Sequence, residues 1–118
     1  IDAMNIDLKA FTDSFYKNIA GGDLDMVKHF IEGAVSTAHV ELTTLIIPQE
    51  NDSEDEMRAL SAWVASLQDK YKKTIPLHVT RFFPRFHMTD RNATPVGTVK
   101  RLAEVARERL EAVFTGNI

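Results

Sequence analysis

Four short segments rich in Val, Ile, Leu, Thr and Phe recur along the chain at a nearly constant interval. Their centres, Ile6, Leu42, Val79 and Val113, lie 36, 37 and 34 residues apart. This composition is typical of β-strands, and the interval is close to that of one strand plus one helix in a repeating β/α fold. The spacing therefore predicts strands over four ranges, namely Ala3–Leu8, His39–Ile47, Leu77–Phe82 and Ala112–Thr115.

Helical periodicity fills the intervals between these strands. Apolar residues three or four apart form four stripes, which are Phe11, Phe15 and Ile19; Leu24, Val27, Ile31 and Val35; Met57, Leu60, Val64, Leu67 and Tyr71; and Val96, Val99, Ala103, Ala106 and Leu110. Asp23 is the expected N-cap of the second helix, and Ser53 with Glu56 forms a capping box for the third. For the last helix we expect Thr94 as the cap and Pro95 at the first helical position.

The strand segments alternate between apolar and polar residues, so that one face of the predicted sheet is apolar and the other polar. Helical crossovers of this length make neighbouring strands parallel, and the helices belong on the apolar face. A parallel sheet with one polar face favours a barrel or partial barrel whose lumen holds a polar ligand. The rival, a doubly wound sheet, usually has a glycine-rich turn after its first strand, and Lys9–Thr12 contains no glycine.

Length and composition narrow the possible functions. The 118 residues predict a single domain, residues 1–118, and a net charge of −3 argues against binding to nucleic acid. The chain has no cysteine and no apolar run long enough to span a membrane. Without a visible signal peptide, we expect a cytoplasmic location and no membrane partner.

Candidate site residues lie on the polar face of the predicted sheet. Asp7 and Lys9 close the first strand, at the end of a parallel strand where barrel enzymes place their sites. Side chains two residues apart point the same way, so this pair either binds a zwitterion or a sugar hydroxyl or forms a simple ion pair. The other polar groups of this face either satisfy one another or bind a ligand or water; they include Asn5, Glu41, Thr43, His78 and Thr80.

Several segments together resemble the radical S-adenosylmethionine (SAM) activating enzymes, in particular pyruvate formate-lyase activating enzyme-like proteins of the AmmeMemo-associated subgroup. The Asp7–Lys9 segment resembles their D-x-K region. The other similar segments are Phe15–Lys17, Val40–Pro48, Asn51–Ser53, His78–Pro84, Met88–Asp90, Thr94–Pro95 and Phe114–Asn117.

The resemblance implies the C-terminal half of a partial (β/α)6 barrel, with about four parallel strands and helical crossovers. The intact enzyme would hold SAM and a 4Fe–4S cluster, cleave SAM to a 5′-deoxyadenosyl radical, and act on a glycyl radical enzyme or another protein. The cluster-binding cysteines are absent from this chain. By this resemblance Asn5, Asp7, Lys9, Thr43 and Thr80 belong to the SAM site, and the isolated chain is inactive.

Two further interpretations stay open at this stage. The first is a non-catalytic α/β binding module with a polar groove. The second is a hydrolase that uses Asp7 and His78, although the sequence offers no nucleophile for it. For a half barrel we also expect self-association, most simply as a two-fold dimer, through the edge of the first strand or through a lumen mouth that exposes Leu45 and Phe82.

Overall fold

A computed structural model describes residues 3–9, 11, 23–83 and 93–118 of the chain. Its elements follow the order β1 (Ala3–Asp7), α2 (Leu24–Thr37), β2 (His39–Ile46), α3 (Glu54–Tyr71), β3 (Leu77–Arg81), α4 (Val96–Arg107) and β4 (Val113–Gly116). All four predicted strands are confirmed, with ends that differ by one residue at most. The helix predicted over Phe11, Phe15 and Ile19 lies, beyond Phe11 itself, outside the described residues.

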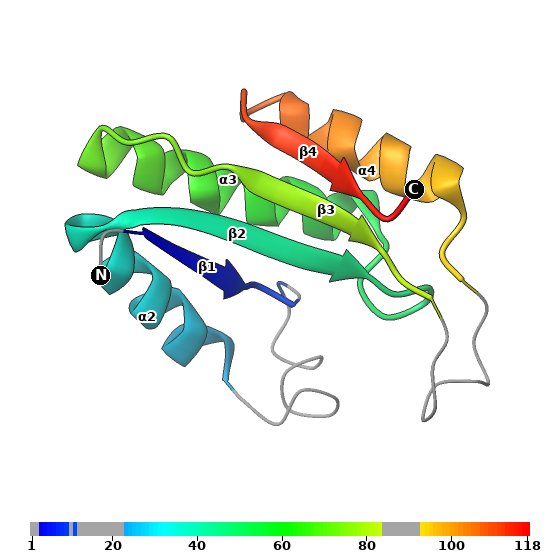
Figure 1. The fold of residues 1–118 in the computed structure, drawn as a ribbon, viewed down its shortest axis with the longest axis horizontal. Coiled ribbons are helices and arrows are strands. Elements are labelled where there is room, and N and C mark those ends of the chain that lie inside the picture. The colour runs from blue at the N-terminus through cyan, green and yellow to red at the C-terminus, as the bar shows by residue number, and fades with distance from the viewer. Residues whose placement is uncertain (1–2, 10, 12–22, 84–92) are drawn as a thin grey trace.

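The strands form one parallel sheet in the order β1-β2-β3-β4. In Figure 1 all four arrows point the same way, and α2, α3 and α4 lie together behind the sheet. No described element covers the face turned toward the viewer. The predicted α/β class, with four parallel strands and helices on the apolar face, is therefore confirmed.

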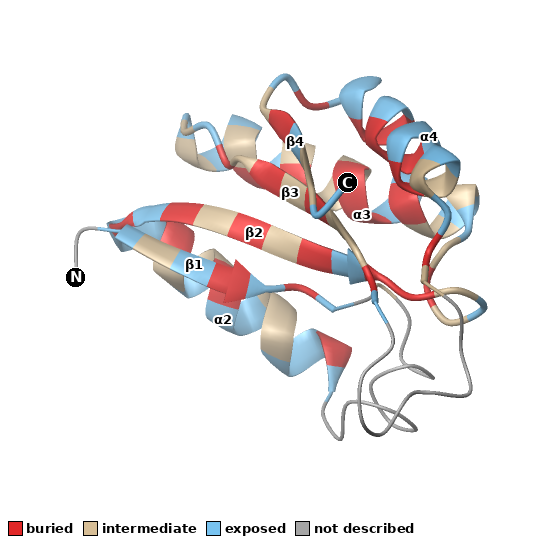
Figure 2. Ribbon diagram, turned by 45° about the vertical axis from the view of Figure 1, so that its right-hand side comes forward, coloured by how far each residue is buried: buried red, intermediate tan, exposed pale blue. Residues whose placement is uncertain are grey.

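Alternation along the strands divides the two faces of the sheet as predicted. In β2, buried Val40, Leu42, Thr44 and Ile46 alternate with residues that keep access to solvent, and Figure 2 shows this as alternating colours along the strand. The buried side chains pack against the helices, where Ile31, Val64 and Leu102 lose all contact with solvent. Burial of this apolar layer, at about 25 cal/mol per Å², is the main force that holds the helices to the sheet.

The starts of α2 and α3 confirm two of the three predicted caps. The carboxylate of Asp23 accepts a hydrogen bond from the N–H of Asp25 at 2.8 Å, and the hydroxyl of Ser53 accepts one from the N–H of Glu56 at 3.1 Å. Only half of the capping box forms, because the side chain of Glu56 does not turn back to Ser53. It accepts instead from the backbone N–H of Phe11 at 2.8 Å.

The predicted start of α4 is wrong. Pro95 is the N-cap, and no side chain accepts a hydrogen bond from the first turn. The side chain of Thr94 is fully buried, and its hydroxyl donates to the carbonyl of Ile46 at the end of β2. A long-range contact therefore outcompetes the local cap, because a buried hydroxyl must find a partner wherever the fold offers one.

Phe82 does not lie on the open face, contrary to the prediction from alternation. The strand β3 ends at Arg81, so the period of two no longer applies to the next residue. Phe82 is only 5% exposed and belongs to the apolar core. Leu45, in contrast, stays 38% exposed on the open face.

Candidate functional site on the open face of the sheet

The open face of the sheet carries a row of polar side chains from β1, β2 and β3. The sheet register aligns Asn5 with Glu41 and Asp7 with Thr43, and Thr43 in turn with His78. On the same face, Thr80 lies beside Leu45. The polar residues predicted from alternation therefore meet on one surface. We call this surface, made of Asn5, Asp7, His39, Glu41, Thr43, His78, Thr80 and Phe114, the polar face.

Glu41 lies at the centre of the polar face and joins two histidines. One carboxylate oxygen is 2.6 Å from Nε2 of His78 on the neighbouring strand, and the other is 3.1 Å from Nε2 of His39. The hydrogen bond with His78, followed by that with His39, holds the pKa of Glu41 below its usual value of 4.5. A carboxylate held this way orients both imidazole rings and remains ionised.

Two more polar contacts lie nearer the end of β1. The hydroxyl of Thr43 donates to Oδ1 of Asn5 at 3.0 Å and so ties β1 to β2. Nζ of Lys9 lies 3.7 Å from a carboxylate oxygen of Asp7, and both side chains are more than half exposed. Asp7 and Lys9 thus form the ion pair that was one of the two predicted alternatives. An exposed pair of this kind adds little stability.

Aromatic and small residues of β4 complete the polar face. The ring of Phe114 stacks on that of His78, with centroids 5.4 Å apart and an angle of 27° between the planes, and it is 51% exposed. Gly116 lies beside Thr80. A β-carbon on Gly116 would come within 2.7 Å of the methyl group of Thr80, so only glycine fits here without displacing that side chain. The hydroxyl of Thr80 donates to the carbonyl of Thr44 at 3.2 Å.

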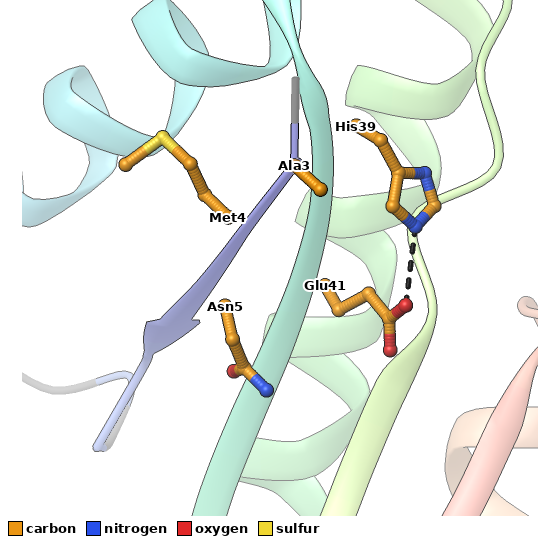
Figure 3. Close-up of a pocket in the computed structure, with 5 residues that line it drawn as sticks. All are labelled: Ala3, Met4, Asn5, His39 and Glu41. Carbon is orange, nitrogen blue, oxygen red and sulfur yellow. Dashed lines mark hydrogen bonds and ion pairs between the residues drawn. The ribbon is translucent and has the colours of Figure 1, made fainter. Parts of the chain in front are cut away.

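A small pocket opens at the N-terminal part of this surface. It has a volume of about 240 Å³ and is lined by Ala3, Met4, Asn5, His39 and Glu41. In Figure 3, Asn5 and Glu41 point to one side of β1, whereas Met4 points to the other side, toward α2. Of the predicted site residues, Asn5 and Glu41 line this pocket. The other four residues that were assigned to the SAM site lie farther toward the C-terminal ends of the strands; they are Asp7, Lys9, Thr43 and Thr80.

The loop after β2 fixes the C-terminal edge of the sheet. The side chain of Asn51, only 4% exposed, accepts a hydrogen bond from the N–H of Ile47 at 2.7 Å. Its amide nitrogen donates to the carbonyls of Lys9 at 2.6 Å and Leu45 at 2.7 Å. Three hydrogen bonds of one buried amide hold the end of β1 against that of β2, which fixes the backbone two residues beyond Asp7 and Thr43.

Sequence reasoning missed three residues of this region. His39 was placed on the correct face but was not recognised as a partner of Glu41, although the spacing of two residues is a usable signal. Asn51 lies in the loop after β2, and nothing in the local sequence points to its hydrogen bond with the carbonyl of Lys9. Phe114 was not assigned to the face, because its segment is too short for alternation to be read.

Comparison with known proteins finds a similar protein of unassigned activity and no matching family. No protein-family profile matches this sequence. The chain is 35% identical, over 120 aligned positions, to a protein of Methanocaldococcus jannaschii named "Uncharacterized protein MJ0808". The match covers all of this chain but only 35% of that protein, so the chain spans about a third of the length of the curated relative it matches.

The assignment to the radical SAM activating enzymes is wrong. No profile of that family matches, and the name of the similar protein gives no activity. The chain has no cysteine, and its described residues contain no group of three or more His, Asp or Glu side chains that could hold a metal ion. The expected enzyme class, the SAM and 4Fe–4S cofactors and the iron–sulfur chemistry are therefore wrong. The glycyl radical enzyme partner was expected only from that resemblance.

None of the helices that the structure describes is both long and apolar enough to cross a membrane.

Proposed function

We propose that this chain is a non-catalytic α/β binding module that forms one wall of a partial (β/α) barrel and binds a small polar ligand on its polar face. One observation carries the proposal. All three described helices cover one face of the sheet, and the other face presents an ordered network of polar side chains to solvent. A face that served only solubility would not require contacts between three different strands.

The position of these side chains further supports a binding role. Ligands of parallel α/β sheets bind at the carboxyl ends of the strands. Asp7 and Thr43 lie toward these ends, next to the backbone that Asn51 fixes. A rigid backbone under polar side chains lowers the entropic cost of binding, because the side chains are already in position. The curvature of a partial barrel would bring a further wall toward this face and enclose the ligand.

The proposal is tested by nuclear magnetic resonance. Amide spectra of the ¹⁵N-labelled chain are recorded with neutral, anionic, cationic and zwitterionic small molecules, one class at a time. We expect at least one class to shift the amides of β1, β2 and β3 in a saturable way. The double variant Asn5→Ala, Thr43→Val removes the side-chain hydrogen bond between these two residues and leaves the backbone pairing of β1 with β2 in place. Because the ligand would lose two hydrogen bonds, we expect its affinity to fall about tenfold.

A matched control lies on the opposite side of the molecule. Asp69→Asn changes an exposed residue of α3 and should leave binding unchanged. If no class shifts the amides of the polar face, or if the shifts map to the helices, the chain does not bind ligands in the proposed way. The spectrum of each variant also reports whether it is folded.

A further inference from the structure

The carboxylates of the polar face already have partners within that face. Asp7 forms an ion pair with Lys9, and Glu41 forms hydrogen bonds with His39 and His78. A cationic ligand would have to compete with these partners, and the carboxylate of Glu41 would repel an anionic ligand. A neutral ligand avoids both costs, so these contacts favour a neutral ligand over an ion.

The remaining hydrogen-bonding capacity of the polar face suits hydroxyl groups. Thr43 uses its hydroxyl hydrogen toward Asn5, which leaves its oxygen as an acceptor. Asn5 accepts that bond through Oδ1 and keeps its two amide hydrogens as donors. A donor and an acceptor lie next to each other here, and a hydroxyl group can bond to both because it donates and accepts.

An exposed aromatic plane ends the same row of residues. The register aligns Thr43 with His78, and His78 with Phe114, across neighbouring strands. Two strand spacings separate Thr43 from Phe114, which is about 10 Å. The ring of Phe114 is half exposed and offers an apolar surface beside the polar groups. Sugar rings have this same combination, with C–H groups on one face and hydroxyls around the edge.

We infer that the polar face binds a neutral carbohydrate of at least two sugar units. One ring lies against Phe114, and the hydroxyls of the next reach Thr43 and Asn5, since a single ring is shorter than the row. This inference rests on the proposed function and specifies its ligand class. It assigns Phe114 as the apolar platform of the site and gives the His78 ring the role of supporting that platform.

The test uses four probes and measures binding by amide shifts and by saturation transfer from protein to ligand. Cellobiose and glucose are the neutral probes, and glucosamine and glucuronate are charged sugars that keep the same ring. We expect cellobiose to shift the amides of Thr43, His78 and Phe114 and to bind more tightly than glucose or either charged sugar. The variant Phe114→Ala should weaken cellobiose binding about fivefold, and Phe114→Trp should preserve it.

The control is an equally exposed phenylalanine on the opposite layer. Phe30 on α2 is 58% exposed, and Phe30→Ala should leave the affinity for cellobiose unchanged. If a charged sugar binds to the polar face and the neutral ones do not, the inference is wrong and the proposed function survives. If no compound of any charge class shifts this face, both are wrong. The inference is also wrong if Phe114→Ala binds cellobiose as tightly as the unaltered chain does. If Phe114→Ala does not fold, the inference is decided by whether Phe114→Trp preserves cellobiose binding and whether cellobiose binds more tightly than glucose.

Discussion

At the scale of single residues, Glu41 makes the stability of the fold depend on pH. Its two hydrogen bonds with histidines hold its pKa below 4.5. A carboxyl whose pKa is lowered in the folded state contributes stability that is fully present above its unfolded pKa. That contribution is lost as the pH falls through the lower, folded value.

The variant Glu41→Gln tests this contribution, because the amide cannot ionise. We expect the free energy of unfolding of the unaltered chain to exceed that of the variant above about pH 4.5, and this difference to shrink as the pH falls further. Urea unfolding followed by circular dichroism at several pH values measures it. The pKa of Glu32 is also lowered, by its hydrogen bonds to Lys70 and Tyr71. Because Glu32 is present in both proteins, its contribution to the pH dependence cancels in the difference between their free energies of unfolding. If the difference in free energy of unfolding between the two proteins stays constant as the pH falls through this range, the contact of Glu41 with the histidines does not persist in solution.

The residues of the polar face could be predicted from alternation, but their partners could not. Alternation places Asn5, Glu41, Thr43 and His78 on one side of the sheet whatever the register is. Which of these side chains contact one another depends on the register of each strand relative to the next. The packing of apolar side chains on the other face sets that register. For this reason the pairing of Glu41 with His78 became visible only in the fold.

At the scale of secondary-structure elements, Glu56 links the start of α3 to the segment that follows β1. Burial, the largest influence, raises the pKa of Glu56 above 4.5, and this outweighs the opposite effect of the hydrogen bond from Phe11. For a carboxyl whose folded pKa is raised, the contribution to stability falls as the pH rises from the unfolded pKa through the folded one.

The variant Glu56→Gln keeps an oxygen that accepts a hydrogen bond from the N–H of Phe11 but removes the half-buried charge. We expect the variant to gain stability relative to the unaltered chain as the pH rises from 4 to 7, and the two to be similar at the acidic end. Thermal unfolding across this range provides the measurement. Glu54→Gln in the same turn is the control. The partly exposed carboxylate of Glu54 pairs with Arg58 and Arg101, so its removal should give no such gain. A loss of stability of Glu56→Gln at pH 7 would contradict the expectation.

The elements themselves could largely be predicted, because period and capping are local properties. Strand alternation, the helical stripes and the caps Asp23 and Ser53 each involve residues within one or two turns of one another. Thr94 and Phe82 were predicted wrongly for one common reason. Phe82 lies just past the end of β3 and Thr94 just before the start of α4, and at both places contacts with distant parts of the chain replace the local pattern.

At the scale of the whole molecule, none of the strands that the structure describes pairs with the outer edge of β1. The backbone N–H of Leu8 donates to the carbonyl of Thr43 on β2. In a parallel ladder, every second residue of an edge strand directs its N–H and C=O toward the neighbouring strand. The backbone groups of Asn5 and Asp7 therefore point away from β2. No other described strand lies beside them. The opposite edge is partly satisfied, because Arg107 donates to the carbonyl of Val113 at 3.0 Å. Open edges of this kind pair with other chains.

We therefore predict a two-fold dimer through β1, in which the two copies of this strand pair with each other. Light scattering at micromolar concentration should give about twice the chain mass of 13.3 kDa. Asn5→Pro removes an N–H from the open edge and should shift the mass to that of one chain, because an edge strand tolerates proline where the N–H makes no bond within the sheet. A mass of one chain for the unaltered protein, unchanged on concentration, would contradict the prediction.

The sheet order β1-β2-β3-β4 also has a consequence for how the chain folds. Every strand pairs only with the strands that precede or follow it in the sequence, so the two ends of the chain need never meet. Each pairing closes a loop of similar, moderate length, and the entropic cost of closure is spread evenly over the steps. Folding can therefore proceed by adding one strand–helix unit at a time. The central strands β2 and β3, with neighbours on both sides, are then the last to open when the native protein fluctuates.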